Sequence, residues 1–361
     1  MSLPTPTADG REAALRAWLQ TTQATLPLQL DSLSPLGSDA SVRRYWRLRS
    51  ADGRALVAMD DPAAPNQLPA YLSVGQRMAA CGLHVPEVLA ADAAQGFALL
   101  EDLGDALFLP VLQAAQRAGE HDTPQRLMRG ASEALLRWQS QGLQHGGPLP
   151  VYDEAFVRRE LQIFVDWCVV KEFGQQWSDK QQQWWEHSCK VLVRNMGEQI
   201  QVPMHRDFMV RNLVACADGS VGVLDFQDAV LGPISYDMGS LLRDAFISWE
   251  EDEELDWAIR YWEGARRAGL FGHGEDAHPM AQDFGLFWKA LEWTVLQRHL
   301  KIMGIFCRVK HRDGRLHYAA DLPRFFAYTI KTAARYVELS PLLRLLEAMQ
   351  PQLVQSDFTL R

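Results

Sequence analysis

Three polar residues in the middle of the chain have the types and the spacing that transfer of a phosphoryl group requires. His205-Arg206-Asp207 is followed by four residues and then by Asn212, and Asp225 comes after a short apolar run. An aspartate can orient or accept the proton of an attacking hydroxyl group, while an asparagine and a second aspartate can hold Mg²⁺ against the phosphates of ATP. We therefore predict Asp207 as the catalytic base and Asn212 and Asp225 as the metal ligands.

A hairpin with its turn at Asp218-Gly219 is expected between these two segments. Asp207 and Asn212 would then lie on one short loop, and Asp225 would follow the second strand of the hairpin. The alternative is a surface aspartate on an ordinary hairpin, which leaves the coincidence of the three polar residues unexplained. Two linked segments with the correct internal spacing therefore favour a phosphotransferase site.

The size and composition of the chain are typical of a globular protein with two lobes or domains. Its 361 residues are 47% hydrophobic and 22% charged, and the formal net charge is -9. The negative charge, without a long basic stretch, argues against nucleic acid or an anionic membrane as a partner. The five cysteines stand singly, which predicts buried thiols in a reducing compartment. Because we find no signal-peptide pattern and no apolar run of about 18 residues, we expect a cytoplasmic enzyme.

The spacing of apolar residues predicts an α+β fold with a small β-rich lobe at residues 1–103 and a larger helical lobe at residues 104–361. In the first lobe we expect helices at 11–22 and 67–81 and strands at 28–36, 42–48, 55–59, 87–91 and 97–101. In the second lobe we expect helices at 124–141, 154–173, 180–195, 236–246, 251–268, 280–304, 320–338 and 342–349.

A small polar loop, Gly37-Ser38-Asp39-Ala40-Ser41, lies between the first two predicted strands. Backbone N–H groups in such a loop can approach phosphate oxygens closely. The sequence alone also allows an ordinary hairpin turn, so Ser41 and its neighbours are candidates for a phosphate-binding loop.

The order of these features resembles that of the aminoglycoside phosphotransferase and choline kinase-like family, which shares the protein kinase fold. The resemblance covers nearly the whole chain and is most specific at residues 204–244, which include Gly232-Pro233-Ile234-Ser235-Tyr236-Asp237. It implies a two-lobe protein-kinase-like fold with ATP and Mg²⁺ in the cleft. The first lobe would bind the nucleotide, and the second would carry catalysis and substrate binding.

Within this family, several local runs look similar to the anomeric kinases of N-acetylmuramate and N-acetylglucosamine, which serve peptidoglycan recycling. These runs are Ser41-Val42-Arg43-Arg44-Tyr45, Met59-Asp60-Asp61-Pro62, Glu101-Asp102-Leu103-Gly104-Asp105 and Gln297-Arg298-His299-Leu300-Lys301. The resemblance implies transfer of the γ-phosphoryl group of ATP to the C1 hydroxyl group of an amino sugar, whereas the residues by themselves indicate only a small hydroxyl compound. The alternatives are a kinase of an aminoglycoside, choline or homoserine, and a non-catalytic nucleotide-binding protein.

The chain departs from kinases of this fold at the cation that binds the phosphates. Such kinases carry a lysine on the third strand and a glutamate on the following helix, but the predicted third strand, Ala55-Leu56-Val57-Ala58-Met59, has no lysine. Arg43 and Arg44, beside the phosphate loop, are the candidates to replace it. Because side chains alternate along a strand, only one of them can point inward, and we favour Arg44.

Glu101 to Leu103 is expected to be the hinge, whose backbone groups would pair with the edge of the adenine ring. The assignment rests on position, because backbone groups rather than side chains would make the contacts. The alternative is an ordinary linker between the two lobes.

Four further residues near the motif are expected to have mainly supporting roles. We expect His205 to support the catalytic loop by hydrogen bonding and Arg206 to pair with a carboxylate. We expect Asp237 to be a buried acceptor that holds the loop. Asp228 is either a second carboxylate of the metal site or an acceptor within the hairpin.

Contacts to the sugar are expected from the helical lobe, and the candidates are Asp166, Trp167, Arg298, Lys301 and Arg312. N-acetylmuramate carries a lactyl carboxylate, which a cation would help to bind. Each candidate also has a plainer interpretation as a surface charge or a core aromatic residue.

Overall fold

The computed structural model describes residues 8–37, 43–62 and 67–355, and the chain divides into two compact units. Unit 1 contains the chain up to Arg137 together with Gln144–Gly146 and Val210–Ala229, and unit 2 contains Trp138–Leu143, Gly147–Met209 and the chain from Val230. Because one boundary passes between Met209 and Val210, Asp207 belongs to unit 2, whereas both predicted metal ligands belong to unit 1.

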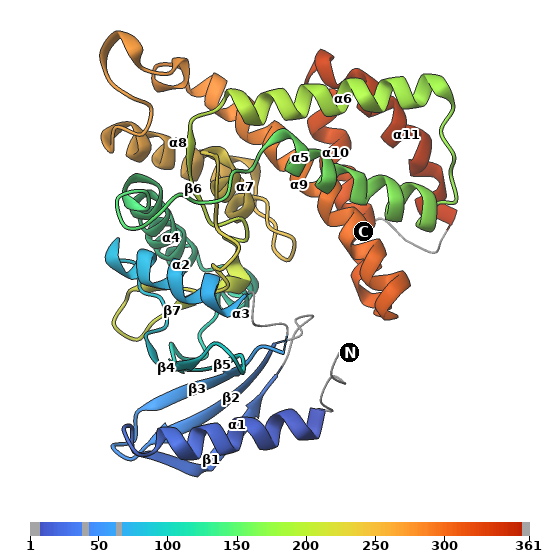
Figure 1. Cartoon of the computed structure of the whole chain (residues 1–361). Coiled ribbons are helices and arrows are strands. Elements are labelled where there is room, and N and C mark those ends of the chain that lie inside the picture. The colour runs from blue at the N-terminus through green and yellow to red at the C-terminus, as the bar shows by residue number, and fades with distance from the viewer. Residues whose placement is uncertain (1–7, 38–42, 63–66, 356–361) are drawn as a thin grey trace. The chain divides into compact units, whose positions relative to one another are not determined.

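A five-stranded antiparallel sheet forms the first part of unit 1, with the strand order β1-β2-β3-β5-β4 (Figure 1). The sequence predicts all five strands. Their observed bounds are β1 Leu28–Leu36, β2 Arg44–Ser50, β3 Ala55–Asp60, β4 Val88–Asp92 and β5 Phe97–Glu101.

The two faces of this sheet have different neighbours. Helix α1 (Ala8–Thr22) covers one face and shares with it a buried apolar cluster that includes Leu15, Leu19, Trp46, Leu48, Leu56 and Phe97. In the register of β2 and β3, Arg44 lies opposite Asp60. Because side chains alternate along a strand, Arg44 shares the α1 face with Trp46, and the residues on either side of Arg44 point to the opposite face.

Helices and a short hairpin complete unit 1. They are α2 (Leu68–Ala80), α3 (Phe108–Ala118), most of α4 (Asp122–Gln141), the 3₁₀ turn η2 (Val210–Asn212), β7 (Leu213–Ala215) and β8 (Val221–Val223). Strands β7 and β8 pair, and Gly219 has φ 84° in the turn, which confirms the predicted hairpin. Helix α3 is not among the predicted elements, and no side chain caps its N-terminus.

Unit 2 is built around the 30-residue helix α9 (Phe284–Asp313), which is orange in Figure 1. Residues 290–304 of this helix are all buried, as expected for a helix that is covered on every side. The other helices are α5 (Glu154–Ile163), the π-helix η1 (Phe164–Glu172), α6 (Asp179–Glu198), α7 (Ser235–Leu242), α8 (Glu251–Arg267), α10 (Leu322–Ala334) and α11 (Ser340–Gln355). Strands β6 (Gln201–Met204) and β9 (Val230–Pro233) pair, and the 3₁₀ turns are η3 (Gly274–Asp276), η4 (Pro279–Ala281), η5 (Leu316–Asp321) and η6 (Val337–Leu339).

The end predicted for the helix at 280–304 is wrong, because the observed helix α9 continues to Asp313. Gly304 lies inside α9, and the helix stops instead at Gly314, which has φ 70°. A glycine is a common helix end in sequence patterns, but here the first glycine has a packing role and only the second ends the helix.

The packing role of Gly304 is a close contact with the backbone of a second helix. A Cβ atom at this position would stand 2.6 Å from backbone atoms of Ile163 and Phe164, so only glycine allows the approach. The predicted helix at 154–173 also changes at this point, from the α-helix α5, which ends at Ile163, to the π-helix η1.

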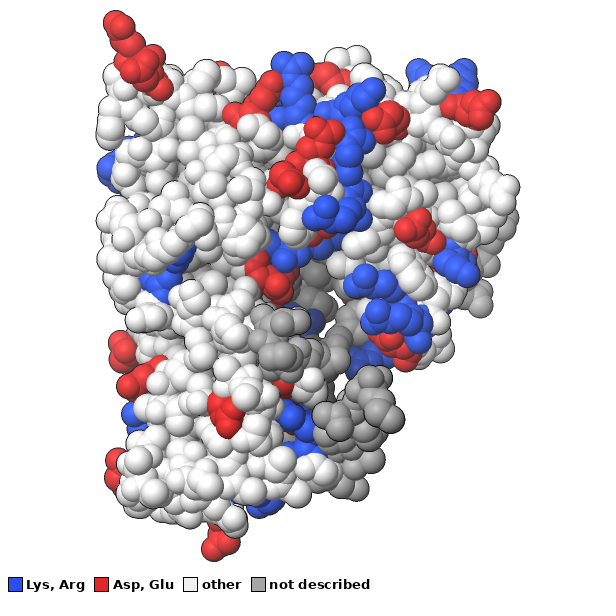
Figure 2. Space-filling view, viewed as in Figure 1, with Lys and Arg blue, Asp and Glu red and all other residues white. Residues whose placement is uncertain are grey.

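None of the helices in the described part of the chain is long and apolar enough to cross a membrane. On the face shown in Figure 2, Lys and Arg side chains are interspersed with Asp and Glu side chains. The cysteines are free thiols, and the prediction that they are buried is confirmed for all except the partly exposed Cys216.

Candidate active site

The predicted catalytic loop, in unit 2, follows strand β6, and a side chain of helix α7 accepts hydrogen bonds from its backbone. The N–H groups of His205 and Arg206 donate hydrogen bonds to the two carboxylate oxygens of Asp237, at 2.6 and 3.0 Å. Asp237 is completely buried, which confirms the prediction of a buried acceptor. Arg206 has φ 75°, a left-handed conformation that non-glycine residues rarely adopt, and the two bonds hold it there.

Burial raises the pKa of Asp237 to about 7, although the two N–H donors of the loop act in the opposite direction. The negative charge of Asp207 adds to the rise. The ionised form of Asp237 offers both oxygens to the loop, whereas a bound proton would occupy one of them.

His205 supports the loop from within. Its imidazole is buried and packs edge-on against Phe208, with 5.6 Å between the ring centroids. Its Nδ1 accepts a hydrogen bond from the N–H group of Asp207 at 3.3 Å. The predicted supporting role of His205 is therefore confirmed, and the loop sets the direction in which the Asp207 side chain leaves the backbone.

A buried carboxylate, that of Glu160 in α5, pairs with cations from the catalytic loop and from α9. Its Oε1 lies 3.3 Å from Arg206 Nη2 and 2.8 Å from Lys301 Nζ. Its Oε2 accepts hydrogen bonds from the Tyr152 hydroxyl group at 2.6 Å and from the Gln297 amide at 3.2 Å. We call Glu160, Arg206 and Lys301 the Glu160 cluster, which confirms that Arg206 pairs with a carboxylate and ties the loop to two helices.

The charges of this cluster stabilise one another. Burial alone raises the pKa of Glu160, but the Lys301 ammonium group and hydrogen bonding outweigh burial and lower the pKa to about 2. Burial lowers the pKa of Lys301, but neighbouring groups, with Tyr236 and Glu160 first among them, raise it above its ordinary value. The negative charge of Asp207 contributes to this rise, so Lys301 and Asp207 are electrostatically coupled.

Three of the predicted sugar contacts have partners that explain them structurally. Trp167 packs against the buried core of unit 2, and Asp166 accepts a hydrogen bond from Gln162 at 2.8 Å. Arg312 pairs with the adjacent Asp313, at 2.7 Å. These contacts support the plainer interpretation of the three residues.

The other two predicted sugar contacts, Arg298 and Lys301, are buried in α9. The charge of Arg298 acts on Asp237, and that of Lys301 is coupled to Asp207. Lys301 is thus the predicted sugar contact with an electrostatic link to the predicted base, and its contact with a sugar stays a prediction.

The two predicted metal ligands lie at the open end of the β7–β8 hairpin in unit 1. The carbonyl group of Asn212 accepts a hydrogen bond from the N–H group of Leu224 at 2.8 Å, which brings Asn212 close to the residue before Asp225. Asp225 has φ 60°, and its side chain is 48% exposed. Amide and carboxylate oxygens are ligands that Mg²⁺ prefers, so these residues fit a magnesium ion.

Phe226 fixes the turn after Asp225. Its buried ring stacks on Tyr71 of α2, with 4.7 Å between the centroids. A Cβ atom at Gly75 would lie 3.1 Å from the same ring, so this glycine makes room for it. The sequence analysis does not predict a role for Tyr71 or Gly75. Their spacing of four residues, which places them on one face of a helix, could have indicated a shared contact.

Arg43 lies among carboxylates in unit 1. It is 4% exposed, its Nε lies 2.9 Å from Asp61 Oδ2, and its Nη2 donates a hydrogen bond to Gln67 Oε1 at 3.0 Å. Its Nη1 lies 3.7 Å from Asp225 Oδ1. Burial lowers the pKa of Arg43, but the hydrogen bond from Arg43 to Asp61 and nearby charges raise it overall. The sequence interpretation misses Asp61 and Gln67.

Arg44 has a different environment. Its Nη2 lies 2.6 Å from Asp60 Oδ2, and Asp60 also pairs with Arg11 of α1. The guanidinium group lies 5.6 Å from the ring centroid of Trp46. Arg44 thus belongs to the α1 face of the sheet, and the geometry favours Arg43 rather than Arg44 as the inward cation.

The predicted hinge, Glu101 to Leu103, follows strand β5. The N–H group of Glu101 donates to the Glu87 carbonyl group at 2.8 Å. The Leu103 side chain lies 2.8 Å from where a Cβ atom at Gly222 would be, so the segment packs against the hairpin. Pairing with adenine stays a prediction, and Ser41 lies outside the described residues.

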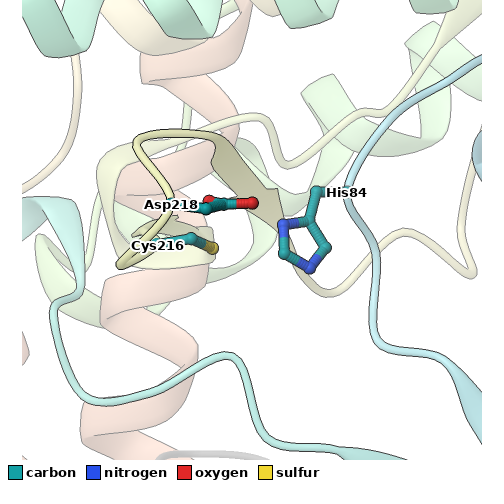
Figure 3. Close-up of side chains that lie close together, drawn as sticks. All are labelled: His84, Cys216 and Asp218. Atoms are coloured by element: carbon teal, nitrogen blue, oxygen red, sulfur yellow. The ribbon is translucent and has the colours of Figure 1, made fainter.

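His84, Cys216 and Asp218 converge at the hairpin turn, with possible ligand atoms within 4.8 Å of one another (Figure 3). The Ser220 hydroxyl group donates to Asp218 Oδ1 at 2.6 Å and lies 2.7 Å from His84 Nδ1. Thiol and imidazole groups are softer ligands than Mg²⁺ prefers. We interpret this group as a hydrogen-bonded anchor that holds the hairpin on the His84 segment, where the Val223 N–H group also donates to the His84 carbonyl group at 2.8 Å.

The sequence matches the model of the phosphotransferase enzyme family at residues 32–274. Three similar proteins are each named N-acetylmuramate/N-acetylglucosamine kinase. The protein of Neisseria meningitidis serogroup B is 41% identical over 350 residues, which cover 97% of this chain and 99% of the relative. The protein of Pseudomonas aeruginosa is 41% identical over 88% of both chains, and that of Caulobacter vibrioides is 30% identical over 81% of this chain and 85% of the relative.

Solved structures with low sequence identity share the fold. An ADP-bound aminoglycoside phosphotransferase has a TM-score of 0.55 at 13% identity, over 88% of this chain and 98% of the other. An ethanolamine kinase of Plasmodium vivax has a TM-score of 0.57 at 10% identity, over 96% and 93%. The predicted α+β, protein-kinase-like fold is therefore confirmed.

Proposed function

Because the chain belongs to the phosphotransferase enzyme family, we propose that it transfers the γ-phosphoryl group of ATP to the anomeric hydroxyl group of N-acetylmuramate and N-acetylglucosamine. The chain is a kinase by family. The observation that carries the choice of sugar is the 41% identity, across nearly the full length of both chains, to a kinase named for these two compounds. A cytoplasmic role in peptidoglycan recycling belongs to the same proposal.

Asp207 is the catalytic base in this proposal. Phosphoryl transfer has a loose transition state, so the base needs to orient the attacking hydroxyl group more than to remove its proton early. Hydrogen bonds from the loop to Asp237, and from the Asp207 N–H group to His205, support this role because they fix the backbone that leads into Asp207. An anomeric hydroxyl group is also more acidic than that of a simple alcohol, which lowers the demand on the carboxylate.

Asn212 and Asp225 would hold Mg²⁺, which neutralises charge on the phosphates when it is bound. The exposed Asp225 carboxylate and the link between Asn212 and Leu224 support this assignment. Backbone groups of Glu101 and Leu103 would contact adenine, and Ser41 would contact a phosphate. We leave Arg44 outside the nucleotide site, because it is engaged on the α1 face.

Incubation with Mg-ATP and a panel of acceptors, followed by phosphorus NMR of the products, tests the proposal. We expect a phosphate on the anomeric oxygen of both amino sugars and no product from their methyl glycosides, in which that hydroxyl group is blocked. Aminoglycosides, choline and homoserine complete the panel. Turnover of one of these instead, or a sugar phosphate at another carbon, would overturn the proposed substrate; nucleotide binding with no turnover of any acceptor would favour a non-catalytic protein.

A further inference from the structure

The sheet face opposite α1 has no cation on β3. Since Leu56 belongs to the apolar cluster on the α1 face, the side chains of β3 on the opposite face are those of Ala55, Val57 and Met59. None is basic, and helix α2 is preceded by Gln67 rather than by a glutamate. A kinase still needs positive charge on the transferred phosphates.

Arg43 reaches this face from the neighbouring strand. Tyr45 lies opposite Met59 in the register of β2 and β3, and alternation places Arg43, two residues earlier, on the same face as Tyr45. Continuing the register places Arg43 opposite Asp61, which agrees with the 2.9 Å ion pair between them. Arg43 therefore brings its charge to the face that lacks a β3 lysine, but from β2.

Each of the three nitrogens of the Arg43 guanidinium group lies near a polar side chain. Nε contacts Asp61 and Nη2 donates to Gln67, which fix the plane of the group. Nη1 points to Asp225, at 3.7 Å, which is the proposed metal ligand. A planar fork of this kind suits recognition of phosphate oxygens better than the point charge of a lysine.

Arg43 places a cation beside Asp225, the proposed metal ligand. A magnesium ion on Asp225 would add positive charge next to the guanidinium group, which suits a phosphate chain. We therefore expect phosphate binding at this place to strengthen when the metal ion is bound.

We infer that Arg43 holds the β- and γ-phosphates of ATP in place of the missing β3 lysine, and that Asp61 and Gln67 are its positioning residues. The inference rests on the proposed function, because it takes Asp225 as a metal ligand and ATP as the nucleotide.

Calorimetric binding of AMP-PNP with Mg²⁺, and of adenosine, to the full-length protein tests this role. Charge-assisted hydrogen bonds contribute enough that Arg43→Lys should weaken AMP-PNP binding by about 10- to 100-fold. Adenosine has no phosphate, so its affinity should stay unchanged. Arg44→Lys is the matched control, and it should leave both affinities unchanged.

The outcomes separate the inference from the proposed function. If the wild-type protein binds no AMP-PNP with Mg²⁺, the proposed function itself fails. If the wild-type protein binds AMP-PNP and Arg43→Lys binds it equally well, or loses adenosine in the same proportion, the assignment of Arg43 is overturned. A weaker AMP-PNP affinity in Arg44→Lys alone would transfer the role to Arg44.

Asp61 provides a second measurement, which decides the matter if Arg43→Lys fails to fold. Asp61→Asn should weaken AMP-PNP relative to adenosine, and Asp61→Glu, which restores the charge, should recover part of the loss. A purely structural ion pair would lower the midpoint of thermal unfolding in Asp61→Asn without changing the ratio of the two affinities, and that result would overturn the positioning role.

Discussion

Each of the two units contains a small group of buried charges, and the two groups have opposite designs. In unit 1, the single cation of Arg43 faces two carboxylates, and one of these, Asp225, is half exposed. In unit 2, the single carboxylate of Glu160 faces two cations and receives two more hydrogen bonds, with every member buried or nearly so. The first group has a carboxylate that is exposed to solvent, whereas the charges of the second group pair mainly with one another. The exposed carboxylate fits the binding role proposed for the first group, and the buried pairing of the second group fits a supporting role.

The largest expected effect is on stability, at the centre of the Glu160 cluster. Glu160→Gln keeps the shape of the side chain but leaves Arg206 and Lys301 without their carboxylate, which should lower the free energy of unfolding by about 3 to 5 kcal/mol. Asp225→Asn in unit 1 should cost less than about 1 kcal/mol, because its side chain is exposed to solvent. Urea unfolding of both variants measures the difference, and equal losses would contradict the comparison.

The next effect is on turnover, at Asp207, whose loop the Glu160 cluster supports. Asp207→Asn should lower kcat on the order of 10²-fold or more, because the amide cannot accept a proton. The affinity for AMP-PNP should persist, because the nucleotide contacts are proposed in unit 1. Steady-state kinetics and calorimetry on the same preparation check both parts; wild-type turnover would remove Asp207 from its role.

A smaller effect on stability is expected at the contact between α9 and α5, beside the Glu160 cluster. Gly304→Ala introduces a Cβ atom against the backbone of Ile163 and should destabilise the protein by about 1 to 3 kcal/mol. Gly197→Ala in α6 is the matched control, since nothing beyond the neighbouring backbone of its own helix lies within 4 Å of the new Cβ atom. That variant should gain about 0.5 to 1 kcal/mol from helix propensity. A loss of stability in Gly197→Ala comparable to that in Gly304→Ala would refute the packing explanation.

The smallest effect is a pH dependence. The pKa of Glu160 is lowered from its ordinary value of 4.5 to about 2 in the folded protein. A lowered folded-state pKa gives stability that is fully present above the unfolded pKa and is lost as the pH falls toward the folded one. The difference in unfolding free energy between the wild-type protein and Glu160→Gln should therefore narrow below about pH 4.5. A constant difference down to about pH 3 would show that the Glu160 charge contributes little.

The sequence predicts the motif and its immediate supports because these are close in the chain. His205, Arg206 and Asp237 have the supporting contacts expected of them, and the hairpin forms at its Asp-Gly turn. Glu160 and Lys301 lie 141 positions apart, and neither carries a local signal that would pair it with the other. Their meeting depends on how α5 packs against α9, which periodicity does not specify.

The choice between Arg43 and Arg44 shows the same limit on a smaller scale. Alternation correctly predicts that the two arginines point to opposite faces. Which of them points inward depends on the register with β3 and on the face that α1 covers, and both are tertiary facts. The assignments of Glu101 and Leu103 stay predictions, because backbone contacts leave little trace in side-chain identity, and that of Ser41 stays a prediction because Ser41 lies outside the described residues.

Gly304 also determines the position of α9 along α5. It stands three residues after Lys301, just as Ile163 stands three residues after Glu160, so the glycine contact and the ion pair lie about one turn apart on both helices. The helices therefore run in the same direction at this point. Because Gly304 has no side chain, the two backbones can approach closely only here, which fixes the register of α9 against α5. A shift of α9 by one turn, about 5.4 Å, would carry Lys301 out of reach of Glu160 and would bring a larger side chain against the backbone of Ile163.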